Sequence, residues 1–371
     1  MSAVATPSVA GSATTPVLRP AASERYVSLD AYRGLIMIVL VSGLFGLRTM
    51  AGHPFWNPVA EQLTHVTWEG IRFYDLIQPA FIFMAGVAVP FALAKRIRQG
   101  FGFGRNFLHV LIRALKLVAI AQLFTVVHRQ QVRLGFINVL NQIAFAYVIC
   151  FLLARLSVRW QVTASAALLA GHTALFFMFP GPEGPFSMTG NVGQAIDRAV
   201  LGYVYDGNYA TINFITSAVN MMFGVWTGYI MLSQRGMREK MRQVALVAAV
   251  AIALGLAISP AVPIVKRIGT ASFNLTATGL VMFGMLACVW LVEVKGYKKL
   301  VFPLVVVGVN SIFIYVVSQL FKGGIFRAIG VIAGKFEWFG AYAGVAHWTA
   351  TLAVMWYFCY WLYRRNVYFK V

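Results

Sequence analysis

The stretch DLIQPAFIFMAGVAVPFALA, residues 75–94, decides the class of fold. After Asp75 it contains no charged side chain before Lys95. A helix of about 20 predominantly apolar residues is long enough to cross a bilayer. We therefore interpret residues 75–94 as a transmembrane helix that opens on an aspartate and is interrupted by Pro79 and Pro90.

The rest of the chain repeats this pattern. Of its 371 residues, 60% are hydrophobic and only 11% are charged, whereas soluble proteins carry about 25% charged residues. The sequence predicts an all-α, polytopic membrane helix bundle with about ten transmembrane helices. A Gly-rich amphipathic stretch at 323–342 is predicted as a re-entrant or interfacial helix, or as an eleventh span. The ten runs lie near residues 33–52, 75–94, 107–127, 135–154, 161–180, 211–232, 243–263, 272–292, 300–321 and 345–363.

The distribution of basic residues predicts how the chain is oriented. The net charge is +20, but the lysines and arginines form short clusters between apolar runs. No nucleic-acid partner is expected, because the sequence has no recognition motif and no continuous basic face. The loops on the side of the N-terminus hold roughly twice as many basic residues as the opposite loops, which predicts that both termini are cytoplasmic. We expect residues 1–24 to be a disordered cytoplasmic tail and 25–371 a single transmembrane domain.

Ionisable residues at the extracytoplasmic face could carry chemistry. His65 and Glu69 are four apart and would share one face of a helix. A carboxylate there could hold one imidazole nitrogen and leave the other as a base. The alternative is an interfacial loop whose polar groups face water. Asp75 has two equal interpretations: it orients the histidine, or it complements the dipole of the helix that it opens.

Polar residues on the cytoplasmic half form a second group. Ser28 could cap the first helix, where Asp30 and Arg33 are spaced to pair. Arg113 and Lys116 lie inside the third run and would repel one another unless an anion lies between them or both snorkel to the headgroups. A phosphate-bearing ligand from the cytoplasm would supply that anion. Amides in the fourth and ninth runs, which include Asn141 and Asn310, are typical of interhelical hydrogen bonding.

The segments RYVSLDAYRG (25–34) and LTHVTWEGIRFYDLIQPAFIFMAGVAVPF (63–91), taken together, resemble the heparan-α-glucosaminide N-acetyltransferase-like family, and its bacterial branch most closely. The resemblance implies a ten-helix enzyme of the bacterial cytoplasmic membrane. Such an enzyme takes acetyl from cytosolic acetyl-CoA and delivers it to an amino sugar across the membrane. The resemblance makes His65 the catalytic histidine and places Arg113 at a basic position of the third core span. The matching positions are Ser28, Asp30, Arg33 and Gly34; His65, Trp68 and Gly70; Asp75 to Phe91; and Gly308, Asn310, Ser311 and Tyr315.

On this basis we expect His65 to act as general base or acyl carrier, with Glu69 or Asp75 orienting it. A continuous hydrophilic passage would join His65 to the cations of the third helix. Acetyl-CoA is the expected co-substrate, and no metal is expected, since the sequence lacks metal-ligand spacing. The other expected partners are a glycan or amino-sugar acceptor and the bilayer, and the sequence leaves a homo-oligomer open. The alternative function is a transporter or flippase for a glycan or lipid precursor. The expected acetyl-CoA-binding residues are Arg33, Arg113, Lys116, Asn141 and Asn310.

Overall fold

The computed structural model describes residues 26–369, and this part of the chain is all-α, with no β-strand beyond two isolated bridges. The predicted all-α class is confirmed. The predicted tail at 1–24 lies outside the described residues, and the single domain at 25–371 stays a prediction.

The α-helices are α1 (Val27–Ser42), α2 (Asn57–Gln62), α3 (Ile77–Arg98), α4 (Phe103–Arg129), α5 (Val139–Leu153), α6 (Val158–Met178), α7 (Val192–Leu201), α8 (Phe214–Leu232), α9 (Met237–Ile258), α10 (Ala271–Val289), α11 (Phe302–Val309), α12 (Ser311–Ile332) and α13 (Ala343–Arg364). Shorter 3-10 or π turns are η1 (Leu47–Met50), η2 (Phe73–Leu76), η3 (Thr211–Asn213), η4 (Trp290–Val294) and η5 (Glu337–Tyr342).

Each of the ten predicted apolar runs overlaps at least one long helix. Among the described residues, seven helices are long and apolar enough to cross a bilayer, which makes the chain an integral membrane protein. The apolar helix α5 is shorter than this limit, and α1 has only 16 residues. The number of spans and the cytoplasmic position of the termini therefore remain predictions.

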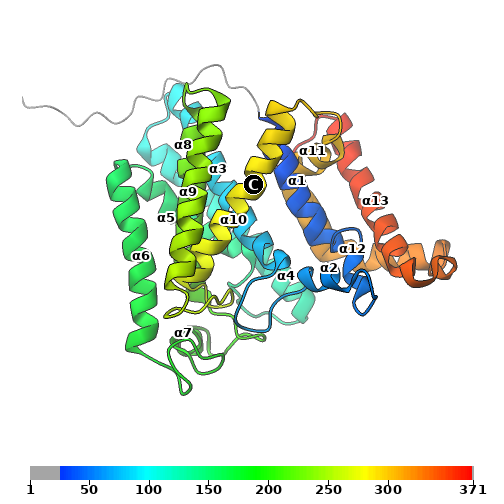
Figure 1. Ribbon diagram of the computed structural model, residues 1–371, viewed down its shortest axis with the longest axis horizontal. Helices are drawn as coiled ribbons and strands as arrows, with labels where there is room; N and C mark the ends of the chain where they lie inside the picture. The colour runs from blue at the N-terminus through cyan, green and yellow to red at the C-terminus, as the bar shows by residue number, and fades with distance from the viewer. Residues whose placement is uncertain (1–25, 370–371) are drawn as a thin grey trace, which may run out of the picture.

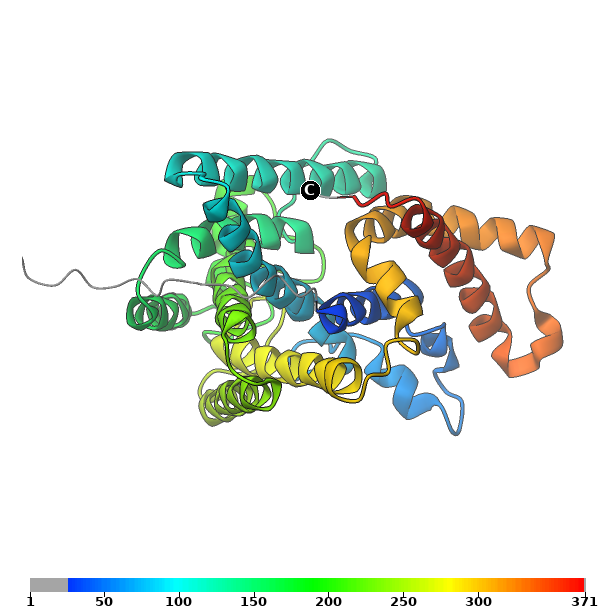
Figure 2. The ribbon, with the colours of Figure 1, turned by 90° about the horizontal axis from the view of Figure 1, so that it is seen from above.

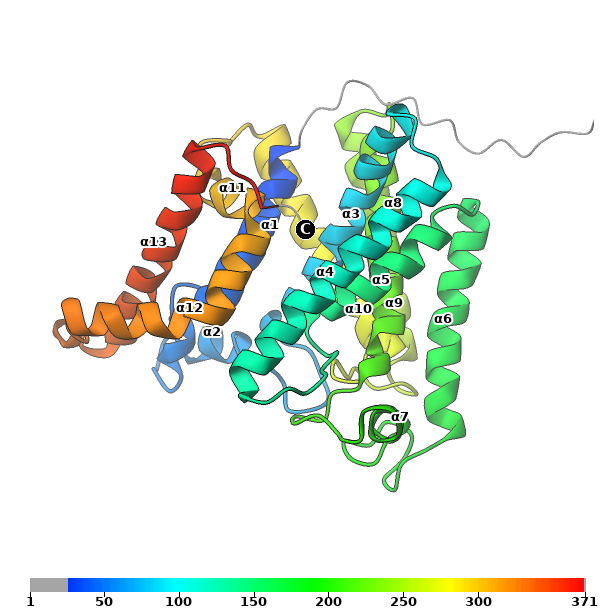
Figure 3. The ribbon, with the colours of Figure 1, turned by 180° about the vertical axis from the view of Figure 1, so that it is seen from behind.

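The ninth predicted run, 300–321, is not one helix. The chain breaks between α11 and α12 at Asn310, and α12 then continues to Ile332. Residues 323–332 are therefore the second half of α12 rather than a separate span. Figure 3 shows that the second half of α12 runs in a different direction from the first half. In the sequence, Gly323 and Gly324 lie near the middle of this helix. Two adjacent glycines weaken a helix because they lose the most backbone entropy.

Glycines allow the central helices to approach one another closely. A side chain at Gly86 of α3 would overlap the carbonyl oxygen of Met221 in α8, and one at Gly224 of α8 would overlap that of Phe83. Gly34 of α1 and Gly308 of α11 make the same kind of contact with the facing backbone. Small residues at helix interfaces are typical of membrane bundles, where close backbone packing replaces the hydrophobic drive.

The bundle has two distinct ends. The start of α1 lies at one end, and α7 lies at the other (Figures 1 and 3). Seen from above, α12 and α13 project to one side of the remaining helices (Figure 2). The loop that precedes α3 and the loop between α9 and α10 meet on the α7 side, where a backbone bridge joins Glu69 to Val265.

Candidate functional site

The segment that carries His65 is a loop rather than a helix. Residues 63–72 lie between α2 and η2 without regular structure. The predicted helix face shared by His65 and Glu69 is therefore wrong. Glu69 is exposed, and no hydrogen bond or ion pair joins its carboxylate to His65 in the described structure. Gly70, with φ +108°, allows the chain to turn at a place where a side chain would be strained.

Asp75 satisfies both of its predicted roles with two different oxygens. Its Oδ2 accepts a hydrogen bond from the backbone N–H of Arg72 at 3.1 Å and so caps the start of η2. Its Oδ1 lies 2.6 Å from Nδ1 of His65. The carboxylate is completely buried. A buried carboxylate needs such partners, because leaving it unpaired is costly.

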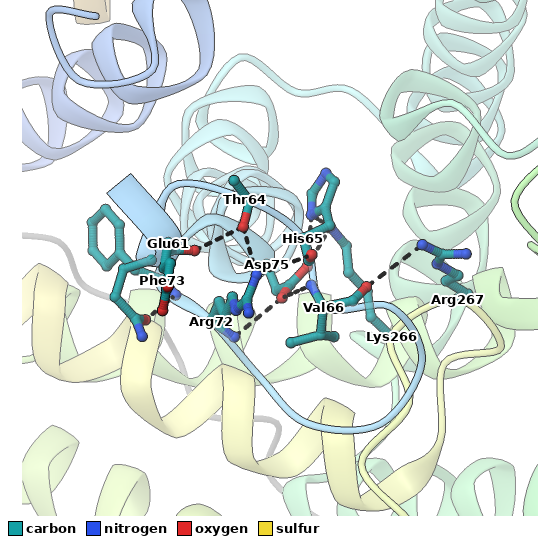
Figure 4. A network of polar contacts seen from close by, with 10 residues as sticks. Glu61, Thr64, His65, Val66, Arg72, Phe73, Asp75, Lys266 and Arg267 are labelled. Atoms are coloured by element: carbon teal, nitrogen blue, oxygen red, sulfur yellow. Dashed lines mark hydrogen bonds and ion pairs between the residues drawn. The ribbon is translucent and has the colours of Figure 1, made fainter. Parts of the chain in front are cut away.

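Lys266 completes the cluster, as Figure 4 shows. Its Nζ lies 3.3 Å from Oδ1 of Asp75 and 3.2 Å from Nδ1 of His65. The short contact between His65 and Asp75 requires a proton between the two atoms, so we assign this proton to Nδ1 of the imidazole. Lys266 donates to the same carboxylate oxygen. The second ring nitrogen, Nε2, is then the one that can accept a proton.

Sequence reasoning missed Lys266, which it counted only as a basic residue of a loop. The side chain is 8% exposed. Burial lowers the pKa of Lys266 below its usual value, and the Asp75 carboxylate opposes this shift. No local pattern marks this lysine, because it lies on the loop between α9 and α10 and its partners are about 200 residues earlier in the chain.

His65 lies in the wall of a cavity of about 460 Å³, which we call the outer cavity. Its imidazole side chain is 39% exposed. The Tyr74 ring packs 4.9 Å from the imidazole ring and forms part of the same wall. The remaining wall is rich in tyrosines and arginines: Tyr203, Tyr205, Tyr209, Arg129 and Arg133. This composition is suited to a polar ligand with flat apolar faces, such as a sugar.

A second cavity, of about 680 Å³, lies toward the start of α1, and we call it the inner cavity. Arg113 and Lys116 both line it, as does Arg33. The predicted pair of Asp30 and Arg33 is confirmed, with 3.5 Å between the charged groups. The Arg113 guanidinium lies 4.7 Å from the ring centre of Tyr147, and its Nε is buried without a hydrogen-bond partner.

The two cavities share a wall made of Phe81, Val139 and Tyr315. The rings of Phe81 and Tyr315 are 6.4 Å apart, and the Tyr315 hydroxyl is hydrogen-bonded to Asn138. These three residues therefore lie where the predicted passage would run. The cations and the imidazole lie in neighbouring cavities on the two sides of this wall.

Two amides that were predicted to bind acetyl-CoA have other roles in the structure. Asn141 donates a 2.7 Å hydrogen bond to the carbonyl of Gly135 and lines neither cavity. Asn310 also lines neither, and it holds the backbone of Val367 and Phe369 instead. Both amides thus bond to backbone groups outside the two cavities, although Oδ1 of Asn141 has no hydrogen-bond partner among the described residues.

Ser28 does not cap α1, because the helix already begins at Val27. The backbone N–H of Ser28 instead donates to the Glu293 carboxylate at 3.1 Å. Trp68, the other bulky residue of the histidine loop, donates from its ring N–H to the carbonyl of Phe186 at 3.0 Å. This bond ties the His65 loop to the long loop before α7.

Fold and site together define a polytopic helical membrane protein in which buried Asp75 and Lys266 contact a partly exposed His65 beside one of two adjoining cavities. Residues 25–184 match the family described as heparan-alpha-glucosaminide N-acetyltransferase, catalytic. The resemblance seen in the sequence is thereby confirmed over this segment, which is less than half of the chain and contains His65 and Asp75 but not Lys266. No curated protein matches the chain.

Proposed function

We propose that this protein is a membrane acetyltransferase that moves an acetyl group from cytosolic acetyl-CoA to an amino sugar or glycan on the other side of the membrane. The observation that carries the proposal is the His65–Asp75 pair in the wall of the outer cavity. A basic inner cavity adjoins it across a thin wall. The family match of residues 25–184 supports the same chemistry.

The inner cavity is the proposed site for the donor. Acetyl-CoA carries several phosphate charges, and Arg33, Arg113 and Lys116 provide counter-charges in one cavity. The buried Nε of Arg113 has no partner in the protein, which suits a residue that waits for an anionic ligand. This arrangement places the start of α1 on the cytoplasmic side, in agreement with the distribution of basic residues.

In this proposal the thioester must pass the wall formed by Phe81, Val139 and Tyr315. Their side chains would have to move when the donor binds, because they separate the two cavities. Rotation of an aromatic ring at such a position is a modest conformational change on the scale of enzyme gating. The wall would also keep water in the outer cavity away from an unpaired thioester.

His65 is the proposed general base. Its Nε2 takes a proton from the acceptor amine or hydroxyl as that atom attacks the thioester carbonyl. The new C–N or C–O bond forms, the C–S bond breaks, and the leaving thiolate receives the proton from the imidazolium. The alternative is an acetyl group carried on His65 itself, which would accumulate when donor is supplied without acceptor.

Asp75 and Lys266 are proposed positioning residues. Asp75 holds the imidazole in the tautomer that leaves Nε2 free, as carboxylates do beside catalytic histidines. Lys266 balances the buried carboxylate and so keeps it ionised without a proton of its own. The predicted role of Glu69 in orienting His65 has no support in the geometry.

The test is purified protein in detergent with radiolabelled acetyl-CoA and glucosamine. Wild type should form labelled N-acetylated product, and His65→Ala should lose at least about 100-fold in rate. His53→Ala is the matched control, because His53 lies in an outer loop and bonds only to nearby backbone. Product formation by His65→Ala at the wild-type rate would reject the proposal. Failure of the wild type to bind CoA would favour the transporter alternative.

A further inference from the structure

A third cavity, of about 330 Å³, adjoins the outer cavity on the side of α12 and α13. The end of α1, the turn η1, Lys322 of α12 and Trp348 of α13 line it. We call it the lateral cavity. It shares Leu40 and Tyr74 with the outer cavity, so one aromatic ring separates it from His65.

Tyr74 lies between the two cavities and contacts a residue of each. Its ring lies 4.9 Å from the ring of His65, and the guanidinium of Arg48 lies 5.7 Å from its centre. A group bound at Arg48 is therefore only one aromatic side chain away from the imidazole. A sugar is large enough to extend past one tyrosine ring.

The charge of the lateral cavity is unbalanced. Arg48 and Lys322 line it, and no aspartate or glutamate is among its lining residues. Within residues 26–369, neither of these cations takes part in an ion pair. Two cations that face one small space repel each other, and an anion between them removes the repulsion.

Snorkelling to lipid headgroups is the ordinary explanation for such cations. Here, however, both are held against aromatic rings of the cavity wall. Lys322 Nζ lies 5.7 Å from the ring centre of Trp348, in the same way that Arg48 lies over Tyr74. Cation–π contacts of this kind keep a charged head in place at low entropic cost. Both cations line the cavity together with the rings that they contact.

The backbone that shapes this wall is strained. Residues 43–46 are all left-handed, and two of them, Leu44 with φ 54° and Phe45 with φ 56°, are not glycine. Gly46 has no room for a side chain, because one would contact Trp348. Strain of this kind persists where the surrounding structure enforces it, and it is concentrated at functional sites.

We propose that the lateral cavity binds a phosphate group through Arg48 and Lys322. A phosphate monoester carries about two negative charges at neutral pH and a diester about one, so either reduces the repulsion between the two cations. Resting on the proposed function, the acceptor is then a phosphate-bearing glycoside whose sugar extends past Tyr74 to His65. The phosphate could belong to a lipid-linked sugar in the bilayer or to a soluble sugar phosphate.

Equilibrium binding to the purified full-length protein in uncharged detergent tests the site without any acetyl transfer. Two pairs of probes separate the two sources of phosphate: dioctanoyl phosphatidic acid against dioctanoylglycerol, and glucosamine 1-phosphate against glucosamine. Wild type should bind the phosphate member of at least one pair about tenfold more tightly. Preference within the lipid pair alone identifies a lipid phosphate, and preference within the sugar pair alone identifies a soluble one.

Arg48→Gln and Lys322→Gln should each weaken binding of the preferred probe about tenfold. Arg48→Lys keeps the charge and should retain most of the binding. Arg327→Gln removes an exposed cation from the same helix outside the cavity and should have no effect. CoA binding by each variant confirms that it is folded.

The proposal is overturned if wild type prefers neither phosphate probe, or if Arg48→Gln and Lys322→Gln bind as wild type does. An equal loss in Arg327→Gln would also overturn it, because the effect would then be one of general charge. Phosphate binding without acetyl transfer would reject the proposed function and keep the site. Acetyl transfer without phosphate binding would reject the phosphate site and keep the proposed function.

Discussion

Nδ1 of His65 lies 2.6 Å from Oδ1 of Asp75, although the two residues are ten positions apart and no helix joins them. The chain leaves α2, turns through an irregular loop that contains Gly70, and returns to place Asp75 at the start of η2. The same carboxylate caps that turn through Oδ2. The contact with the histidine therefore depends on a backbone turn that the aspartate itself stabilises.

Asp75→Asn tests the link between this turn and the site. The amide keeps the size of the side chain but removes the charge that orients the imidazole and balances Lys266. We expect the acetyl-transfer rate to fall at least about 100-fold. We also expect the variant to be destabilised by about 3 kcal/mol, because a buried lysine is left without its partner.

The double variant Asp75→Asn, Lys266→Met separates the two effects. Removal of the lysine as well should restore much of the melting temperature, since no buried charge remains unpaired. Activity should stay low, because the imidazole still lacks its carboxylate. Recovery of activity in the double variant would show that Asp75 acts only on stability.

Lys266→Met should alter the pH dependence of acetyl transfer. The ammonium group lies 3.3 Å from Oδ1 of Asp75 and is one of the charges that lower the pKa of this carboxyl group, after the hydrogen bond from His65. Without it, Asp75 takes up a proton at higher pH, so the acid limb of the pH–rate profile should move to higher pH. Tyr74, Asp75 and the Arg72 guanidinium, which lies 3.4 Å from the His65 carbonyl, also face the histidine and are unchanged.

The measurement for Lys266→Met is the rate at limiting acceptor concentration across neutral pH. Lys266→Arg, which keeps a charge at this position, serves as the control and should leave the acid limb closer to that of wild type. An acid limb at the same pH in wild type and Lys266→Met would mean that the lysine has no electrostatic effect on Asp75.

Phe81→Ala tests the wall between the cavities. Loss of the ring should open the inner cavity to the outer one. We expect hydrolysis of acetyl-CoA without acceptor to increase several-fold, because water gains access to the thioester. Release of free CoA, measured with and without glucosamine, checks this prediction. Phe313→Ala is a control for the loss of a large ring that lines neither cavity.

Gly308→Ala tests the close contact between α11 and α1. An added methyl group would overlap the carbonyl of Asp30, so the helices must separate. Overpacking of this kind costs about 1–3 kcal/mol. Gly323→Ala is the matched control, because nothing lies within 4 Å of the position that its methyl group would occupy. The melting temperature should fall for Gly308→Ala and stay equal or rise for Gly323→Ala. The reverse order would contradict the packing argument.

The sequence alone was sufficient to predict the all-α class, the position of most long helices, and His65 and Asp75 as neighbours. An uncharged run such as 76–94 is stable in a bilayer only as a helix, because every backbone polar group must be paired. The motif residues His65 and Asp75 could be named because both lie in one short segment. The shared cavity of Arg113 and Lys116 followed from their spacing on one helix.

Only the tertiary structure decided which of these groups meet. Glu69 was excluded because residues 63–72 are not helical, and Asn141 and Asn310 were excluded because neither side chain lines the inner cavity. Lys266 joined the site across 191 residues, and Arg48 and Lys322 came together from distant helices. Hydropathy and residue spacing indicate which segments form helices and which side chains share a helix face. Contacts between distant segments depend instead on how whole helices pack. Glycine contacts such as those of Gly34 and Gly308 set that packing.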